Sequence, residues 1–167
     1  MCIVDVLIGL PGAGKTSYAR NFVITNPDWM IITLDAVREM LYGRYVYNDT
    51  DQSMMQLIAG FIVKQVVQSG RNAIIDDTVM VLTKAARREL ILSLRALLYT
   101  EKIQIRAIDF SYDFEICLNR RIAEPRGVSA IHWKKVISEM VQQFEPISEF
   151  EGFDEIISID STIKERI

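Results

Sequence analysis

The stretch VLIGLPGAGKTSYARNF, residues Val6 to Phe22, holds the residues whose types and spacing most clearly predict chemistry. Eight of them match the pattern G-x-x-x-x-G-K-[ST] of a phosphate-binding loop. Glycines let the backbone turn its N–H groups toward phosphate oxygens, and the helix that follows adds its positive N-terminal end. We therefore expect this loop to hold ATP or another nucleoside triphosphate. The expected contacts come from Gly9, Pro11, Gly12, Ala13, Gly14, Lys15, Thr16 and Ser17.

Two side chains at the end of this loop predict how the phosphates are held. Lys15 is expected to neutralise the β- and γ-phosphates, and the Thr16 hydroxyl is expected to bind Mg²⁺. A second Mg²⁺ contact is predicted where the apolar run NAIIDDTVM ends in carboxylates, because a Walker B aspartate holds the ion through water. Asp76 and Asp77 are both candidates for that position.

The stretch MIITLDAVREML places Asp35 and Arg38 between a predicted strand and a predicted helix. One interpretation makes Asp35 a helix N-cap that accepts a backbone N–H, with Arg38 solvated on the helix. The other makes Asp35 a general base that accepts the proton of an attacking hydroxyl. Arg38, three positions further along, then reaches the same pocket and clamps a phosphate of the acceptor.

The stretch DFEICLNRRIAEPRGVS crowds Arg120, Arg121 and Arg126 into a short helix and a loop. Next to a triphosphate, this segment, about residues 113–128, is expected to form a lid whose guanidinium groups stabilise charge on the transferred phosphoryl group. The planar fork of arginine suits bidentate phosphate contacts better than lysine does. The alternative interpretation is a solvated arginine cluster.

Several other side chains are expected to be structural. The helix over Met54–Val67 is expected to pack its apolar face in the core, and Arg87 and Arg88 are expected on an outer helix face. The tyrosines around Arg44 are expected to pack a loop rather than to stack on bases. These tyrosines are Tyr42, Tyr45 and Tyr47.

An alternation of strands and helices must position all of these residues. Five short apolar segments rich in β-branched residues predict strands, and the stretches between them predict helices. The alternation favours a single α/β domain over residues 1–167: three layers, with a five-stranded parallel sheet flanked by helices. Ligands of such sheets bind beyond the carboxyl ends of the strands. The predicted strands are Ile3–Gly9, Met30–Asp35, Asn72–Asp77, Ile103–Phe110 and Glu155–Asp160, and the predicted helices are Lys15–Asn26, Asp35–Tyr42, Asp51–Ser69, Thr83–Thr100, Asp113–Arg121 and Ser129–Phe144.

The composition is that of a globular domain, with 50% hydrophobic and 25% charged residues in a chain of 167. A net charge of −3 argues against a general nucleic-acid binder but still allows a few arginines to grip the end of a strand. Cys2 and Cys117 are isolated, which is typical of a reducing compartment. Because the N-terminus shows no signal-peptide pattern and no apolar run is long enough to span a membrane, we expect a cytoplasmic protein without a membrane partner.

The motifs GLPGAGKT, TLDAVR and IIDDT, together with the arginine lid, resemble the 5′-hydroxyl kinase domain of bacteriophage-type polynucleotide kinase and its small P-loop kinase relatives. The resemblance spans Ile3 to about Phe144, and the D-x-x-R after the second strand is its most specific part. It implies an adenylate-kinase-like topology with the loop strand in the centre of the sheet. It also implies Mg²⁺-dependent transfer of the γ-phosphate of ATP to the 5′-hydroxyl end of single-stranded DNA or RNA. By analogy, such an activity serves the repair of nucleic-acid ends.

The resemblance also implies roles for individual residues. Lys15 and Thr16 match the residues that hold ATP and Mg²⁺, and Asp35 matches the general base for the 5′-hydroxyl. Arg38 matches the residue that grips the acceptor's phosphate, and Arg126 matches the lid arginine at the transferred phosphoryl group.

The chain departs from the family's pattern in two places. Asp77 and Thr78 match the first two residues of the family's Asp-Thr-Asn, but the third is Val79 here. The spacing of the lid also differs, so that either Arg120 or Arg121 supplies the second lid arginine.

Two other functions fit the same residues. A P-loop kinase for a small-molecule hydroxyl, such as a nucleoside, a sugar or an antibiotic, also carries an aspartate after the second strand. A neutral substrate of that kind has no phosphate for Arg38 to hold. An ATP-hydrolysing switch or binding module is the alternative of another class, and it requires an oriented water in place of an acceptor.

Overall fold

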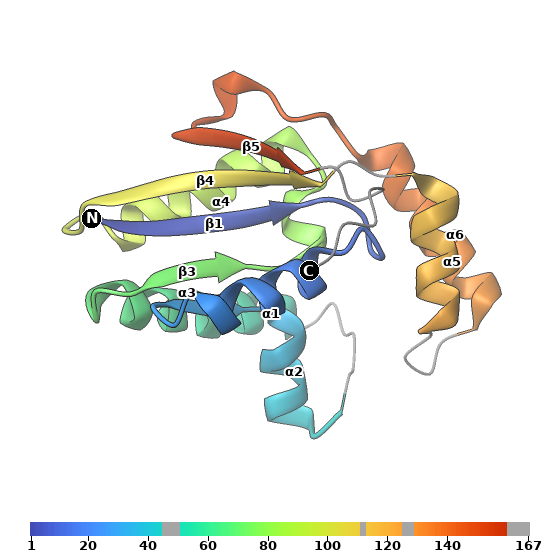
Figure 1. The fold of residues 1–167 in the computed structure, drawn as a ribbon, viewed down its shortest axis with the longest axis horizontal. Helices are drawn as coiled ribbons and strands as arrows, with labels where there is room; N and C mark the ends of the chain where they lie inside the picture. The colour runs from blue at the N-terminus through green and yellow to red at the C-terminus, as the bar shows by residue number, and fades with distance from the viewer. Residues whose placement is uncertain (45–50, 111–112, 125–128, 160–167) are drawn as a thin grey trace.

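The computed structural model describes residues 1–44, 51–110, 113–124 and 129–159. Within these residues, five parallel strands form one sheet in the order β2-β3-β1-β4-β5 (Figure 1). The strand that leads into the glycine-rich loop, β1, lies in the centre, as the resemblance implied. The strands are β1 (Cys2–Ile8), β2 (Trp29–Ile32), β3 (Asn72–Ile75), β4 (Ile103–Phe110) and β5 (Glu155–Ile159).

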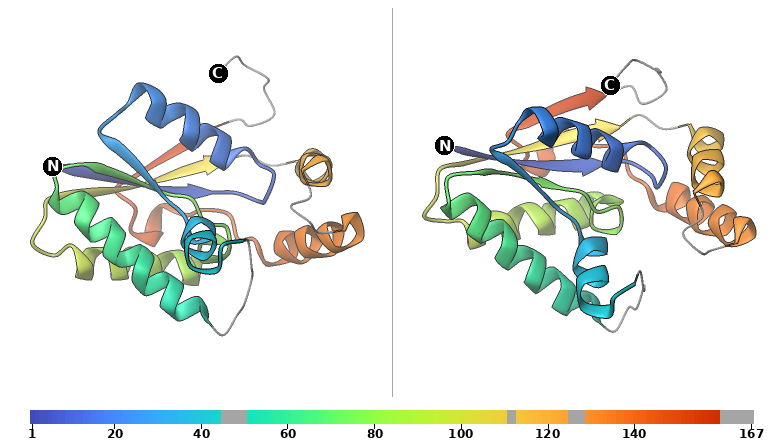
Figure 2. Two further views of the ribbon diagram at one scale, coloured as in Figure 1. Left: turned by 90° about the horizontal axis from the view of Figure 1, so that it is seen from below. Right: turned by 60° about the horizontal axis from the view of Figure 1, so that its bottom comes forward.

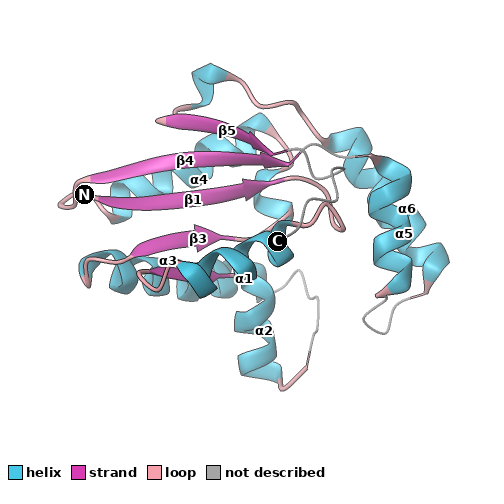
Figure 3. Cartoon of the chain, in the orientation of Figure 1, coloured by secondary structure: helices cyan, strands magenta, loops and turns pink. Residues whose placement is uncertain are grey.

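Helices cover both faces of the sheet and gather at the carboxyl ends of its strands. Figure 2 shows α3 and α4 on one face and α1 on the other, and Figure 3 shows α5 and α6 beyond the strand ends. This arrangement confirms the predicted three-layer α/β fold. The helices are α1 (Lys15–Thr25), α2 (Leu34–Tyr42), α3 (Gln52–Gln68), α4 (Lys84–Leu97), α5 (Phe114–Ala123) and α6 (Ala130–Gln143), with short 3₁₀ helices η2 (Val79–Val81) and η3 (Glu149–Glu151).

The central strand is buried on both of its faces, which explains why it reads as a nearly continuous apolar run. Val4, Val6 and Ile8 pack into the cluster that includes residues of α3 and α4. Leu7 points the other way, into the cluster that includes residues of α1, α5 and α6. Successive side chains of a strand point to opposite faces, so one strand supplies both cores.

The second predicted strand ends earlier than expected, and this changes the setting of Asp35. β2 ends at Ile32, and Thr33 takes an extended conformation in which its hydroxyl accepts the backbone N–H of Asp35 at 3.2 Å. Thr33 is therefore the N-cap of α2, and the N-cap interpretation of Asp35 is wrong. Asp35 lies in the first turn of α2, where a carboxylate is favoured by the helix dipole.

The expectation that Arg87 lies on an outer helix face is also wrong. Its side chain is fully buried, and its Nε and Nη2 donate to the two carboxylate oxygens of Glu151 at 2.5 and 2.9 Å. Nη1 donates to the carbonyl oxygens of Val81 and Leu82 at 2.9 and 3.2 Å. The guanidinium thereby attaches the segment before β5 to α4. Arg88 is exposed, as expected.

Helix α3 packs in the core with only part of its apolar surface. Met55, Val63, Val66 and Val67 are buried, in agreement with the predicted core face. Met54, Leu57 and Phe61, however, are exposed along one side of the helix. Among the described residues, no helix, α3 included, is long and apolar enough to cross a membrane.

The buried Arg87–Glu151 pair generates a stability prediction. Glu151→Ala leaves the Arg87 guanidinium buried without its carboxylate, so the free energy of unfolding is expected to fall by about 3–5 kcal/mol. Urea denaturation measures this change. Arg88→Ala, at an exposed position of the same helix, is the control and is expected to change stability by less than about 0.5 kcal/mol. A loss in Glu151→Ala no larger than in the control contradicts the prediction.

Candidate functional site

The glycine-rich loop connects β1 to α1 at the carboxyl edge of the sheet. Gly12 and Gly14 have positive φ angles of 87° and 99°, and Gly14 is the N-cap residue of α1, without a side-chain cap. A side chain at position 12 has no room, because its Cβ would overlap the backbone carbonyl of Cys117 in α5. Positive-φ glycines and an uncapped helix N-terminus are the features that bind anions. Of the other predicted contact residues, Pro11 and Ala13 are buried and Ser17 is exposed.

Lys15 lies folded back over its own loop. Its Nζ donates to the carbonyl oxygens of Gly9 and Leu10, at 2.7 and 2.9 Å. Only 5% of the residue is exposed, and burial lowers the pKa of the ammonium to about 8, against the opposing charges of Asp76 and Asp77. These two hydrogen bonds hold the buried amine against the backbone of its own loop.

The end of β3 brings a carboxylate to the first turn of α1. The Thr16 hydroxyl donates to Asp76 Oδ2 at 2.6 Å, and Asp76 is only 8% exposed. Among the described residues, no group of three or more His, Cys, Asp or Glu side chains is placed to hold a metal ion. Mg²⁺ is usually bound through one or two protein oxygens together with water and phosphate oxygens. The hydroxyl and carboxylate oxygens of Thr16 and Asp76 fit that donor set.

Asp77, the next residue, faces another direction. Its carboxylate accepts the backbone N–H of Met80 at 3.1 Å, near the charges of Asp35, Arg38 and Asp76. Burial is the largest effect on this carboxyl group and raises its pKa to about 6. Both aspartates lie near Lys15, but Asp76 accepts from Thr16 of α1, whereas Asp77 lies near the charges of Asp35 and Arg38 of α2.

Helix α2 presents Asp35 and Arg38 as an ion pair. Arg38 Nη1 donates to Asp35 Oδ1 at 3.0 Å, and Arg38 Nη2 donates to Gln52 Oε1 of α3 at 2.6 Å. The Arg38 side chain is only 4% exposed, whereas that of Asp35 is 37% exposed. The carboxylate is therefore the outer member of the pair. A role for Arg38 as a clamp on an acceptor phosphate stays a prediction, and it requires this guanidinium to become more accessible.

The described part of the predicted lid is α5, which packs directly against the loop. Arg120 Nη1 donates to the carbonyl oxygen of Gly12 at 3.2 Å. The Arg121 guanidinium carbon lies 4.7 Å from the ring centroid of Trp133 in α6. Arg126, and Tyr45 and Tyr47 of the predicted tyrosine group, lie outside the described residues.

Two contacts among the candidate site residues were not expected from the sequence. Gln52 binds Arg38 across 14 residues of sequence, and no spacing or motif indicated that pair. The carbonyl of Cys117 behind Gly12 was missed as well. The glycine at position 12 was the available signal for the second contact, because glycine is required where two backbones nearly touch. Thr78 directly precedes η2, and Val79 is exposed.

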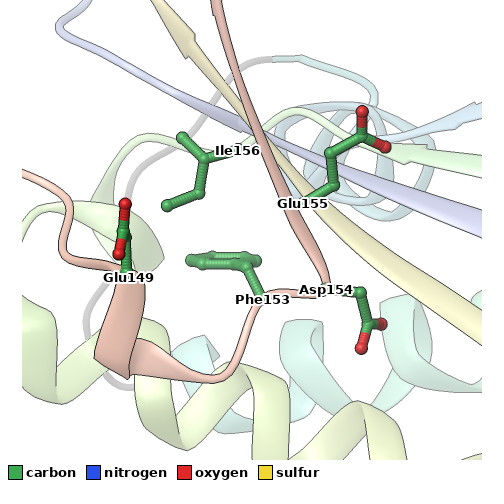
Figure 4. A pocket seen from close by; sticks show the side chains of 5 residues that line it. All are labelled: Glu149, Phe153, Asp154, Glu155 and Ile156. Carbon is green, nitrogen blue, oxygen red and sulfur yellow. The ribbon is translucent and has the colours of Figure 1, made fainter.

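Two hollows lie outside this group of residues. One, with a volume of about 320 Å³, is lined by residues just before and at the start of β5 (Figure 4). The other, of about 120 Å³, lies among β2, α2 and α3 and is lined mostly by apolar side chains. None of the predicted site residues lines either hollow. The first is lined by Glu149, Phe153, Asp154, Glu155 and Ile156, and the second by Ile31, Ile32, Thr33, Ala36, Val37, Met40 and Ile62.

Comparison with protein families matches residues 4–147 to the family described as AAA domain. The chain belongs to the AAA domain family. The matched range includes the glycine-rich loop, Asp35, Arg38 and both aspartates after β3. No curated protein matches this AAA domain in sequence.

Solved structures of kinases share the fold of this AAA domain. A fungal RNA kinase is 14% identical, with a TM-score of 0.67 over 98% of this chain and 77% of that one. A gluconokinase from Sinorhizobium meliloti 1021 is 14% identical, with a TM-score of 0.55 over 97% and 83%. A chain of the Pnkp1/Rnl/Hen1 complex is 22% identical, with a TM-score of 0.59 over 71% and 38%. At these identities, the likeness shows a P-loop kinase fold and not the acceptor.

This AAA domain also spans less than half of the chains that it matches in two structures of the Pnkp1/Rnl/Hen1 assembly, 38% of one and 46% of the other.

The protonation of Lys15 generates a prediction about nucleotide affinity. Phosphate oxygens favour the charged amine, so the affinity for ATP is expected to fall as the pH rises through about 8, by roughly tenfold between pH 7 and pH 9. Isothermal titration calorimetry at several pH values measures this dependence. The control is Lys15→Arg, whose guanidinium stays charged over that range. Equal pH dependence in both proteins contradicts the prediction.

Proposed function

We propose that this AAA domain is an ATP-dependent kinase that transfers the γ-phosphate of ATP to the 5′-hydroxyl end of DNA or RNA. The observation that carries the proposal is the position of Asp35, a partly exposed carboxylate in the first turn of α2 and near Asp77, the residue after the Asp76 that accepts from Thr16. A carboxylate that orients a nucleophile recurs in phosphoryl transfer, and hydrolytic switches orient a water instead. Residues 1–167 form one kinase domain in this proposal.

The triphosphate half of the site is built from the loop. Backbone N–H groups of the loop, of which Pro11 has none, and the N-terminus of α1 would surround the phosphates, and the Lys15 ammonium would move from the Gly9 and Leu10 carbonyls to the β- and γ-phosphates. Thr16 and Asp76 would hold Mg²⁺ through their hydroxyl and carboxylate oxygens. When bound, the ion neutralises charge that develops on the phosphates.

The acceptor half of the site is built from α2 and the end of β3. The acceptor oxygen bonds to the γ-phosphorus while the bond from that phosphorus to the β,γ-bridging oxygen breaks, and ADP leaves. The proton of the acceptor hydroxyl goes to the Asp35 carboxylate. Asp77, near the charges of Asp35 and Arg38, and Thr78, the residue after it, would border the acceptor.

The lid supplies positive charge from the opposite side. Arg120 already contacts the loop through the Gly12 carbonyl, and Arg121 adds a second positive charge near Lys15. In the proposed reaction Arg126 contacts the transferred phosphoryl group, as the family resemblance implies. Guanidinium groups placed where negative charge develops lower the barrier to transfer.

The nucleic-acid acceptor is supported by the D-x-x-R of α2 and by fold similarity to an RNA kinase. A small-molecule acceptor is the second candidate. The observation that favours it is the burial of Arg38, which lies beneath Asp35 and leaves the carboxylate as the outer group. Fold similarity to a gluconokinase is consistent with that candidate as well.

The acceptor is tested with γ-labelled ATP and Mg²⁺, supplied with 5′-hydroxyl DNA, 5′-hydroxyl RNA, nucleosides or no acceptor. The proposal predicts that label reaches the oligonucleotides. Label on nucleosides alone overturns the nucleic-acid acceptor and supports the second candidate. Label in free phosphate at the same rate with every acceptor overturns the kinase proposal and supports the switch.

The role of Asp35 is tested by Asp35→Asn. The amide cannot accept the proton of the hydroxyl, so kcat for transfer is expected to fall by about 10²- to 10⁴-fold. The affinity for ATP is expected to stay near that of the wild type, because Asp35 lies outside the loop. Single-turnover transfer and nucleotide titration measure the two quantities. Loss of ATP binding in this variant identifies Asp35 as a structural residue.

A further inference from the structure

Arg38 makes a contact with the start of α3 that neither the motif nor the family resemblance includes. Gln52, the first residue of α3, accepts Arg38 Nη2 on its Oε1 at 2.6 Å. The other terminal nitrogen of the same guanidinium, Nη1, donates to Asp35 Oδ1 at 3.0 Å. A planar guanidinium therefore joins an amide on one helix to a carboxylate on another.

We propose that Gln52 is a positioning residue, which holds Arg38 and through it the Asp35 carboxylate in the orientation that receives the acceptor hydroxyl. This inference rests on the proposed kinase function. It gives Arg38 a role beneath Asp35, instead of a clamp on a phosphate of the acceptor.

The burial of the two side chains supports a place for Arg38 beneath Asp35. The Arg38 side chain is 4% exposed and the Asp35 side chain is 37% exposed, so an incoming acceptor meets the carboxylate first. A buried guanidinium needs acceptors for its donors, and Gln52 supplies one of them inside the protein. Because the guanidinium is planar and rigid, fixing one nitrogen limits where the other can lie.

A second contact fixes the place of Gln52 itself. Tyr42, at the end of α2, donates its hydroxyl to Asp51, the residue before Gln52. The two helices also share the small core cluster of Leu34, Val37 and Met55. The start of α3 is therefore attached to α2 by a hydrogen bond and by apolar packing. These two contacts fix the position from which Gln52 reaches Arg38.

Loss of the Gln52 amide is expected to slow the chemical step. Removing the amide leaves Arg38 Nη2 without this acceptor in a buried place, and the guanidinium is expected to turn toward another partner. Asp35 then loses its fixed orientation. Displacing a catalytic group by about 1 Å costs roughly 10²-fold in rate, whereas the binding of ATP at the loop is untouched.

The test compares Gln52→Ala and Gln52→Glu with the wild type in the presence of ATP. Three acceptors are supplied separately: a nucleoside, the same nucleoside bearing a 3′-phosphate, and a 5′-hydroxyl oligonucleotide. Gln56→Ala, at an exposed position one turn along α3, is the matched control. We expect Gln52→Ala to lower kcat by about 10- to 100-fold for every acceptor that the wild type uses, with KM for ATP unchanged. The carboxylate of Gln52→Glu still accepts from Arg38 and is expected to restore kcat to within about threefold. Thermal unfolding of the three variants confirms that they are folded.

Three results overturn the inference. The first is an unchanged kcat in Gln52→Ala. The second is a raised KM confined to the 3′-phosphate acceptor, which makes Arg38 the phosphate clamp. The third is a Gln52→Glu variant as slow as Gln52→Ala. If the wild type transfers phosphate to no acceptor, the proposed function itself fails, and this outcome is distinct from an active wild type whose rate is indifferent to Gln52.

Discussion

The hydrogen bond from the Thr16 hydroxyl to Asp76 joins the two segments on which the candidate site depends. Thr16 follows β1 and Asp76 follows β3, and these neighbouring strands pair in parallel with Val6 opposite Ile75. Because both strands end at the same edge of the sheet, the loop and the carboxylate lie close together although they are far apart in the sequence. Helix α2 approaches this pair after β2, and α5 approaches it after β4. The proposed phosphate site at the loop and the proposed acceptor site at α2 both depend on that strand order.

Two ion pairs, one buried and one with a partly exposed arginine, hold the scaffold that keeps this edge in place. Asp5 of β1 is 1% exposed, and its two oxygens accept Nε and Nη2 of Arg106, directly opposite on β4, at 2.7 and 2.9 Å. Arg87 and Glu151 form the other pair, between α4 and the segment before β5. Breaking such a pair leaves a buried charge uncompensated, so each one favours a single arrangement of the elements that it joins.

The sequence predicted most of the fold, because strands buried on both faces alternate with amphipathic helices and each type of pattern is local. β4 was predicted with its observed bounds, and the other elements differ by a few residues at their ends. Asp35 was assigned to a strand end because the capping role of Thr33 was not recognised. Arg87 was misplaced for a different reason: its partner Glu151 lies 64 residues away, and helix periodicity carries no information about such a pair. The Arg38–Gln52 contact was missed for the same reason, since it crosses from one helix to the next.

In the proposed reaction, the Asp35 carboxylate receives the proton of an acceptor hydroxyl that faces the loop-bound triphosphate. A crystal structure of the complex with a non-hydrolysable ATP analogue, Mg²⁺ and a 5′-hydroxyl oligonucleotide tests it most directly. We expect a carboxylate oxygen of Asp35 within about 2.6–3.2 Å of the acceptor hydroxyl, and that hydroxyl in line with the γ-phosphorus. A hydroxyl bound away from Asp35, or a water in its place with the oligonucleotide elsewhere on the surface, would contradict it.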